Sequence, residues 1–299
     1  MGQQWGWPLV DVFFDKHISG GGVAQICGLI LVTLLILIYS IIYTVTFLTW
    51  GKRSSPGLWG WKGVCSKRRV TTTTKKCRVL LAIAHPDDEV MFFGPTILNL
   101  LRDGHSVYIL CFSYGDSEGQ GLTRKSELWK SCRVLGVPDE NVTIIKHDHL
   151  KDGMTNRWPI LPLSAHIRSF LNSYGIDTLI TFDRSGVSGH LNHISVHNAA
   201  QDLVERNLLP NDCEVYSLKS VGFFRQYALN LFNIPLSYFF NQFVHVARGS
   251  DYKTIVKAMK SHSSQMLWYR HLHILFSMYL VVNIFQKISR PITLASHSK

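Results

Sequence analysis

From Arg78 onward, short apolar runs alternate with longer amphipathic stretches, and most of the apolar runs stop at a polar or glycine-containing loop. Short runs of branched apolar residues are typical of buried strands, and apolar residues three or four apart are typical of helices packed on a sheet. Strands are predicted at 79–83, 107–112, 142–145 and 178–182, and helices at 89–102, 123–135, 163–174 and 190–206. This alternation predicts an α/β fold, a Rossmann-like and mostly parallel sheet with helices on both faces.

A different pattern fills the N-terminal part of the chain. No charged residue occurs from Gly20 to Gly51, and Val23 to Trp50 is almost wholly apolar. This length exceeds the roughly 20 residues that span a bilayer and the about 7–15 apolar residues of a cleaved signal peptide. A buried core helix is the alternative, but no polar residue marks a solvent-facing side. Residues 23–50 are therefore predicted to be a transmembrane anchor, preceded by a short lumenal N-terminus at residues 1–22.

Basic residues dominate the segment that follows. Between Gly51 and Pro86 the chain has nine Lys and Arg and no acid. By the positive-inside rule this flank faces the cytosol, so the larger part of the chain is predicted to be cytosolic. The six scattered cysteines, without C-x-x-C spacing, fit reduced thiols in that compartment. The formal net charge of +11 indicates anionic lipid headgroups rather than nucleic acid, because no zinc finger, recognition helix or aromatic ladder accompanies it.

Composition divides the rest of the chain into three parts. Residues 51–77 are predicted to be a basic linker and residues 78–218 the catalytic α/β core. Residues 219–299 then carry ten Lys and Arg against one acid, among aromatic and apolar runs. The uncharged run from Ile274 to Phe285 would be about 18 Å long as a helix, too short for a bilayer core of about 30 Å. Two interpretations stay open: this C-terminal part lies in the membrane interface, or it is ordinary domain core.

Candidate chemistry follows two of the predicted strands. Residues 84–89, Ala-His-Pro-Asp-Asp-Glu, come directly after strand 79–83, and residues 189–193, Gly-His-Leu-Asn-His, come shortly after strand 178–182. Because the carboxyl ends of parallel strands share one edge of a sheet, the two loops are expected to face each other. His85, Asp88 and His193 would then supply two imidazoles and one carboxylate, the ligand set of a catalytic zinc with an open position.

Two further residues of these loops are candidates for acid–base work. Asp87, adjacent to Asp88 but pointing elsewhere, is predicted to be the general base that takes a proton from the attacking water. If a helix begins here, His190 shares a face with His193 and reaches the reacting carbonyl as oxyanion partner or acid. Glu89 stays open between support of the metal ligands and a place in the first turn of the helix.

Two further residues and one long loop are also candidates for a role at the site. His197 lies one turn beyond His193, but a core or surface role is favoured over a ligand role. Asp183 is a candidate to orient His190 through a hydrogen bond. The loop 147–162 is long and polar, and long loops in compact domains are usually functional or mobile.

The pairing of His-Pro-Asp-Asp-Glu with Gly-His-x-Asn-His resembles the LmbE-like metal-dependent de-N-acetylases. Within them it resembles the PIG-L type, the membrane-bound eukaryotic N-acetylglucosaminyl-phosphatidylinositol de-N-acetylases. The likeness runs from about Arg78 into the C-terminal region, and the segment before it matches only in kind, as a membrane anchor. The resemblance implies a divalent metal, zinc first, on His85, Asp88 and His193, with Asp87 and His190 as catalytic residues.

The resemblance also implies an activity. The expected reaction removes the N-acetyl group of N-acetylglucosaminyl-phosphatidylinositol to give the glucosaminyl lipid and acetate, an early step of GPI-anchor biosynthesis at the endoplasmic reticulum membrane. Two alternatives stay open: a membrane deacetylase of another N-acetyl sugar or glycolipid, and a non-catalytic glycolipid-binding protein of the same fold. A nucleotide-binding Rossmann module is disfavoured, because no G-x-G-x-x-G follows the first strand.

Overall fold

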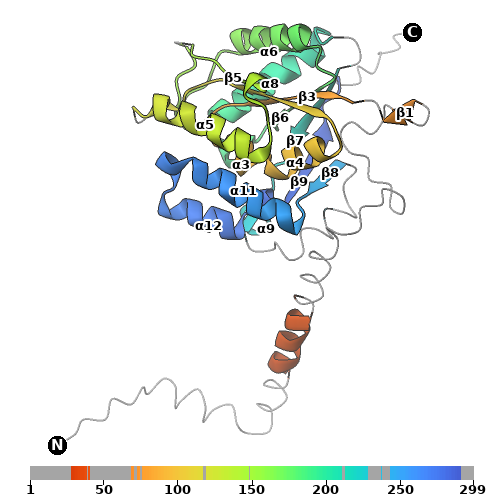
Figure 1. The fold of residues 1–299 in the computed structure, drawn as a ribbon, viewed down its shortest axis with the longest axis vertical. Coiled ribbons are helices and arrows are strands. Elements are labelled where there is room, and N and C mark those ends of the chain that lie inside the picture. The colour runs from red at the N-terminus through yellow and green to blue at the C-terminus, as the bar shows by residue number, and fades with distance from the viewer. Residues whose placement is uncertain are drawn as a thin grey trace, which may run out of the picture. The chain divides into compact units, whose positions relative to one another are not determined.

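The chain divides into two compact units, Met1–Arg53 and Ser54–Lys299. The computed structural model describes residues 28–38, 40, 69–70, 73–74, 76–116, 119–147, 149–210, 213–227, 237 and 243–290. In the first unit, residues 28–38 are helical and their apolar side chains are exposed (Figure 1). No helix among these residues is both long and apolar enough to cross a membrane. Most of the predicted anchor at 23–50, the lumenal segment 1–22 and most of the linker 51–77 lie outside the described residues.

The second unit is built on a seven-stranded sheet with the order β5-β4-β3-β6-β7-β9-β8. Its strands are β3 (Arg78–Ile83), β4 (Ser106–Cys111), β5 (Val142–Ile144), β6 (Thr178–Phe182), β7 (Glu214–Leu218), β8 (Phe243–Val246) and β9 (Val282–Lys287). Strands β3 to β7 pair in parallel, whereas β9 is antiparallel to both β7 and β8. The predicted mostly parallel sheet is confirmed. A separate ladder pairs two-residue strands, β1 (Arg69–Val70) and β2 (Thr73–Thr74).

Helices cover both faces of this sheet, as predicted. They are α3 (Asp88–Met91), α4 (Gly94–Arg102), α5 (Gly121–Leu135), α6 (Ile160–Tyr174), α7 (Gly186–Gly189), α8 (Leu191–Glu205), α9 (Phe223–Tyr227), α11 (Gly249–Ser261) and α12 (Trp268–Phe276). Short 3-10 turns are η3 (Asp139–Asn141), η4 (Ser263–Gln265) and η5 (Met278–Leu280). Figure 1 shows α6 and α8 on one side of the sheet and α4, α5 and α11 on the other.

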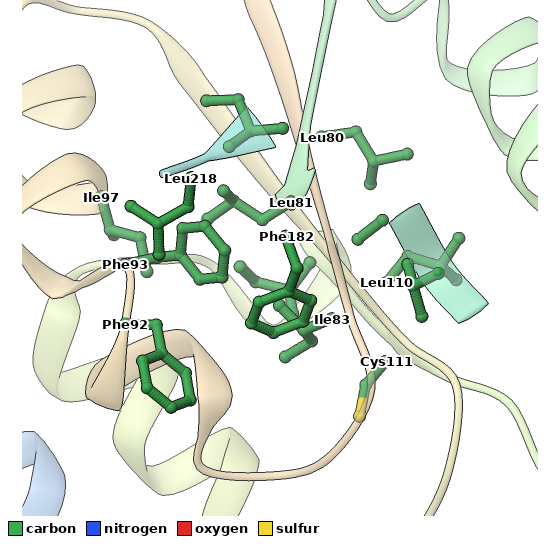
Figure 2. Close-up of a cluster of buried hydrophobic side chains, with 14 of the residues drawn as sticks. Leu80, Leu81, Ile83, Phe92, Phe93, Ile97, Leu110, Cys111, Phe182 and Leu218 are labelled. Carbon is green, nitrogen blue, oxygen red and sulfur yellow. The ribbon is translucent and has the colours of Figure 1, made fainter. Parts of the chain in front are cut away.

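The core lies between the central strands and the helices beside them. Leu81 and Ile83 of β3 and Phe182 of β6 are fully buried, and Figure 2 shows Phe92 and Phe93 in the same cluster. Full burial of each such side chain stabilises the fold by about 1.5–3 kcal/mol. Because β3 is held by neighbours on both sides, the loop that leaves its carboxyl end starts from a rigid position.

The predicted helix 89–102 is broken into α3 and α4. Phe92 and Phe93 have φ of −120° and −122° and leave the helical conformation. Pro95 follows directly, in the first turn of α4. Proline has no N–H for a continuing helix but is tolerated in a first turn, where that donor is unpaired anyway. The break turns two phenylalanine rings into the core and separates α3, which carries the acidic motif, from the packing helix.

The C-terminal part joins the same sheet. The run from Ile274 to Phe285 is not one helix, because α12 ends at Phe276, the turn η5 follows, and β9 begins at Val282. Asn283, fully buried, accepts hydrogen bonds from Thr96 and donates to the carbonyl of Phe92 at 2.8 Å. The C-terminal part therefore contributes both sheet core and, on α12, exposed apolar side chains.

Candidate active site

The loop after β3 is organised by the carboxylate of Asp88. Its Oδ2 accepts the backbone N–H groups of Ala84 at 3.0 Å and His85 at 2.8 Å, which fixes the turn out of the strand. Its Oδ1 lies 3.2 Å from His193 Nε2. Burial raises the pKa of Asp88, but the imidazoles of His193 and His85 lower it more, and the net pKa lies below the ordinary value. Asp88 is therefore a buried, ionised carboxylate aimed at two histidines.

The loop after β6 delivers the second imidazole. Gly186 and Gly189 have φ of 59° and 76°, and Val187 has φ of 63°, so the chain turns sharply here before α8 begins. His193, in the first turn of α8, stacks on the ring of Phe182 with 4.0 Å between centroids and 4° between planes. Its Nδ1 lies 3.1 Å from the Gly186 carbonyl, to which it donates if protonated, leaving Nε2 toward Asp88. The two predicted loops do face each other.

His85, Asp88 and His193 are all buried, and one ligand atom from each lies within 4.8 Å of the others. His85 Nδ1 lies 3.8 Å from Asp88 Oδ2. The other ring nitrogen of His85, Nε2, lies 2.9 Å from Asp152 Oδ1 and 3.0 Å from Asn192 Oδ1. Metal-binding histidines commonly donate their second N–H to a carboxylate or carbonyl in this way.

A second observation supports a metal at this position. His193 Nε2 is buried, and no described residue offers it an aligned hydrogen bond, although Asp88 Oδ1 is near. A buried polar atom left without a partner is costly, so it indicates a missing partner. Two imidazoles and one carboxylate fit a divalent cation with open coordination positions. The three predicted ligands are thus brought together in an arrangement that can hold a metal ion.

Asp87 points away from Asp88, toward two arginines. Its Oδ2 accepts from Arg270 Nη2 at 2.7 Å, and its Oδ1 lies 3.7 Å from Arg124. Its backbone has φ of 120°, which is strained for a residue with a Cβ by about 1–3 kcal/mol. The two adjacent carboxylates are therefore directed to different partners, Asp87 to arginines and Asp88 to histidines. Their roles as general base and metal ligand stay predictions.

The strained backbone of Asp87 is held by Glu89. The fully buried Glu89 accepts the Asp87 N–H on Oε2 at 3.0 Å. Its Oε1 accepts from Ser131 Oγ at 2.6 Å and lies 2.7 Å from His262 Nε2. Burial lowers the pKa of His262, but the Glu89 carboxylate raises it more, so the net pKa lies above the ordinary value. Glu89 lies in the first turn of α3, as one interpretation had it, and it supports the backbone of Asp87 rather than any of the three predicted metal ligands.

His190 caps α8 and stacks beside His193, with 4.7 Å between ring centroids. Its Nδ1 accepts the N–H of Asn192 at 3.2 Å, so a single proton on the ring resides on Nε2. Burial and the imidazoles of His85 and His193 lower the pKa of His190 to about 4. The ring is thus neutral near pH 7 and can donate from Nε2, which suits the predicted role of oxyanion partner better than that of acid.

Two weaker candidates have structural roles. His197 is buried, and its Nδ1 lies 3.0 Å from the Phe182 carbonyl, away from the metal ligands. Asp183 accepts from the backbone N–H of Ser185 at 3.0 Å and of Ser220 at 2.7 Å. No hydrogen bond joins it to His190 among the described residues, so it supports the loop rather than that ring.

Several residues of the site were not named as candidates from the sequence. Asp152 comes from the long loop before α6, and beside His85 and Arg124 its pKa falls to about 2, against the effect of burial. Arg124 reaches the site from α5, Arg270 from α12 and His262 from the end of α11. Only the unusual length of the Asp152 loop pointed to any of them.

Comparison with known proteins agrees with this geometry. The sequence profile of the PIG-L family, described as GlcNAc-PI de-N-acetylase, matches residues 80–204. The chain is 39% identical over 228 residues to a Bos taurus protein named N-acetylglucosaminyl-phosphatidylinositol de-N-acetylase, covering 76% of this chain and 90% of that one. It is 35% identical to a Schizosaccharomyces pombe protein named as a probable enzyme of the same type, covering 70% and 86%.

A solved structure shares the fold. The N,N'-diacetylchitobiose deacetylase from Pyrococcus horikoshii superposes with a TM-score of 0.53 at 16% identity, covering 72% of this chain and 87% of that one. Because the family profile spans both halves of the site and the bovine relative is matched over nearly its whole length, the chain belongs to the PIG-L family of N-acetylglucosaminyl-phosphatidylinositol de-N-acetylases.

Proposed function

We propose that this chain hydrolyses the acetamide of N-acetylglucosaminyl-phosphatidylinositol to give glucosaminyl-phosphatidylinositol and acetate, an early step of GPI-anchor biosynthesis. The observation that carries the proposal is the buried group of His85, Asp88 and His193 with Asp87 beside it. The names of relatives that this chain matches over most of their length supply the substrate.

The three ligands define where the acetamide must lie. With a divalent ion, zinc in our proposal, held by His85, Asp88 and His193, the site would polarise the acetamide carbonyl and favour attack by water near neutral pH. The ligand side chains are oriented by Asp152 and by the Gly186 carbonyl, so they need little rearrangement. Preorganised groups of this kind stabilise developing charge better than mobile ones.

In this proposal Asp87 is the general base. Its carboxylate is held beside Arg270, and its backbone is held by Glu89, so its direction is set from both ends. In the proposed reaction Asp87 takes one proton from the attacking water and passes that proton to the sugar nitrogen as its bond to the carbonyl carbon breaks. A positioned base contributes about 10²–10⁴-fold to the rate.

In this proposal His190 stabilises the oxygen of the tetrahedral intermediate. Its Nδ1 is occupied by the Asn192 N–H, so its Nε2 is the donor available to a substrate. One donor at such an oxygen contributes about 3–4 kcal/mol to transition-state stabilisation. This role requires a neutral ring with its proton on Nε2, which agrees with the pKa of about 4.

We further propose that the enzyme is anchored in the endoplasmic reticulum membrane by residues 23–50, with the catalytic domain in the cytosol. The uncharged sequence of that segment and the exposed apolar side chains of helix 28–38 support an anchor, and the nine basic residues behind it support the orientation. Protease added to sealed microsomes should digest the catalytic domain. Protection of the domain until the membrane is dissolved would reverse the orientation.

The deciding experiment measures metal content and acetate release on purified full-length protein. We expect one divalent metal per chain and acetate release from N-acetylglucosaminyl-phosphatidylinositol, with Asp88→Asn as the inactive, metal-poor control. Release from other acetamido-sugars but not from this lipid would leave a deacetylase with a different substrate. Stoichiometric metal with no release from any acetamido-sugar would instead support a glycolipid-binding protein.

A further inference from the structure

Helices α9 and α12 pack against each other and leave a set of large apolar side chains uncovered. The two helices also meet where the ring of Tyr227 lies 6.3 Å from that of His273. We call the exposed set the α9–α12 apolar face, made of Phe223, Phe224, Leu267, Trp268, Leu272 and Leu275. Phe224 is 77% exposed and Trp268 is 74% exposed. Soluble protein surfaces seldom leave so many large apolar side chains together without a partner.

The opposite side of α12 reaches the candidate active site. Arg270 donates to Asp87 at 2.7 Å, and His273 Nε2 lies 3.4 Å from the Met91 carbonyl. The helix is fixed to α11 by Tyr252, whose hydroxyl donates to the Ile274 carbonyl at 2.7 Å. Helix α12 thus presents apolar side chains outward and, on its inner side, Arg270, the ion-pair partner of the proposed base Asp87. The α9–α12 apolar face is therefore separated from the candidate site by the thickness of α12 alone.

Charge around this face indicates its partner. From Phe223 to Arg290 the sequence has eight Lys and Arg and one acid, Asp251. That acid is already paired with Arg102. Arg270 and Lys287 are paired with Asp87 and Glu214, but Lys253, Lys257 and Lys260 on the neighbouring α11 are exposed and form no ion pair with a described acid. A surface of exposed Trp, Phe and Leu beside these lysines matches the interfacial layer of an anionic bilayer, where aromatic side chains lie at headgroup depth and Lys and Arg contact phosphate.

We propose that the α9–α12 apolar face docks on an anionic lipid bilayer and so holds the candidate site at the level of the lipid headgroups. The proposal rests on the proposed function, because a lipid-borne sugar stays at the bilayer surface while its acetamide has to reach Asp87. An anchor followed by a linker tethers a domain but does not orient it. A second, weaker contact adds orientation and raises the effective concentration of the site at the surface.

The test compares two substrates on full-length protein in vesicles of phosphatidylcholine and phosphatidylserine. One substrate is the lipid-borne N-acetylglucosaminyl-phosphatidylinositol, and the other is its water-soluble N-acetylglucosaminyl-inositol headgroup. We expect the triple variant Phe223→Ser, Trp268→Ser, Leu275→Ser to turn over the lipid about tenfold more slowly or worse, since each deletion removes apolar area that would be buried in the bilayer. Hydrolysis of the soluble headgroup and the metal content should match the wild type.

Matched controls use exposed leucines on other helices, Leu122→Ser on α5 and Leu161→Ser on α6, which are 78% and 61% exposed. Neither control should change either rate. If the triple variant does not fold, Phe224→Ser and Leu275→Ser are tested singly, each with a smaller loss confined to the lipid substrate.

Three results would overturn the proposal. The first is an unchanged rate of the triple variant on the lipid, and the second is an equal loss of rate on both substrates. The third is a change in the oligomeric mass of the triple variant in detergent with normal lipid turnover, which would assign the face to a second copy of the chain. Failure of the wild type on both substrates would refute the proposed function itself, so the two failures are distinguishable.

Discussion

The site is built from two strand-to-helix junctions, and they are stabilised in different ways. Both leave parallel strands at the same edge of the sheet, β3 into α3 and β6 into α8, and both pass through positive φ before the helix starts. At the first junction the strained residue is Asp87, a functional side chain. At the second the left-handed positions fall on Gly186, Val187 and Gly189, and the functional histidines are relaxed.

Their supports differ as well. The first junction is held by Glu89, buried with His262, which lies 173 residues away in sequence. The second is held by Asp183, whose partners are uncharged: Ser185, two residues away, and Ser220, 37 residues away. Removing one member of a buried ion pair strongly destabilises the fold, because the other member is left in the interior without a partner for its charge. The comparison indicates that the base depends on a charged partner from the C-terminal part of the domain, whereas the histidine loop depends on uncharged partners such as Ser220.

The largest effect should come from replacing each of the two carboxylates of the first junction by an amide, in separate variants. Asp88→Asn should lose both metal and activity, because Asp88 contacts both imidazoles of the ligand group. Asp87→Asn should keep near-stoichiometric metal and lose about 10²–10⁴-fold in kcat. Metal analysis and acetate release on both variants check this, and reversed metal contents would exchange the assigned roles.

Next in size is the loss of the remote support. Glu89→Ala should destabilise the domain by about 3–5 kcal/mol, because it leaves His262 buried without its partner. Asp183→Asn keeps one acceptor oxygen but turns its NH2 toward one of two backbone N–H donors, so it should cost about 1–3 kcal/mol. Urea unfolding of the two variants measures the difference. Equal costs would show that the junctions are supported equally.

A smaller effect, on metal affinity, should follow from replacing a glycine of the second junction by alanine, which adds one methyl group. A Cβ on Gly186 would lie 2.9 Å from Ile194 Cγ1 and 3.1 Å from His193 Cβ, whereas a Cβ on Gly189 would meet nothing within 4 Å. Both substitutions pay about 1–2 kcal/mol for a left-handed alanine. Only Gly186→Ala should also displace His193, so its metal affinity should fall about tenfold below that of the Gly189→Ala control. Metal titration of the two variants decides this.

The smallest effect is in the pH dependence of stability. The folded-state pKa of His262 is raised by Glu89, so its contribution is fully present below the unfolded pKa near 6.5 and is lost as pH rises through the folded value. The melting temperature of the wild type should therefore exceed that of His262→Gln by more at pH 6 than at pH 9. Calorimetry at both pH values measures the gap, and a gap that widens toward pH 9 would contradict the sign.

The ligand group and the parallel sheet were predictable because their signals are local. A branched apolar run indicates a strand, a polar motif after it marks the carboxyl edge, and parallel strands bring such edges together. His85, Asp88 and His193 therefore met as predicted. The break between α3 and α4 was missed because helical periodicity continues across Phe92 and Phe93, and only packing against Phe182 shows that these rings turn into the core.

The remaining partners were decided by tertiary structure alone. Asp152, Arg270 and His262 stand in stretches whose residue types also suit an ordinary surface or core. Arg270 meets Asp87 across 183 residues of sequence, because α12 packs beside α11 and returns the chain to the edge of the sheet. Local sequence determines which residues can bind a metal or move a proton. The packing of distant segments determines which charge lies beside them, because that depends on where remote helices come to rest on the sheet.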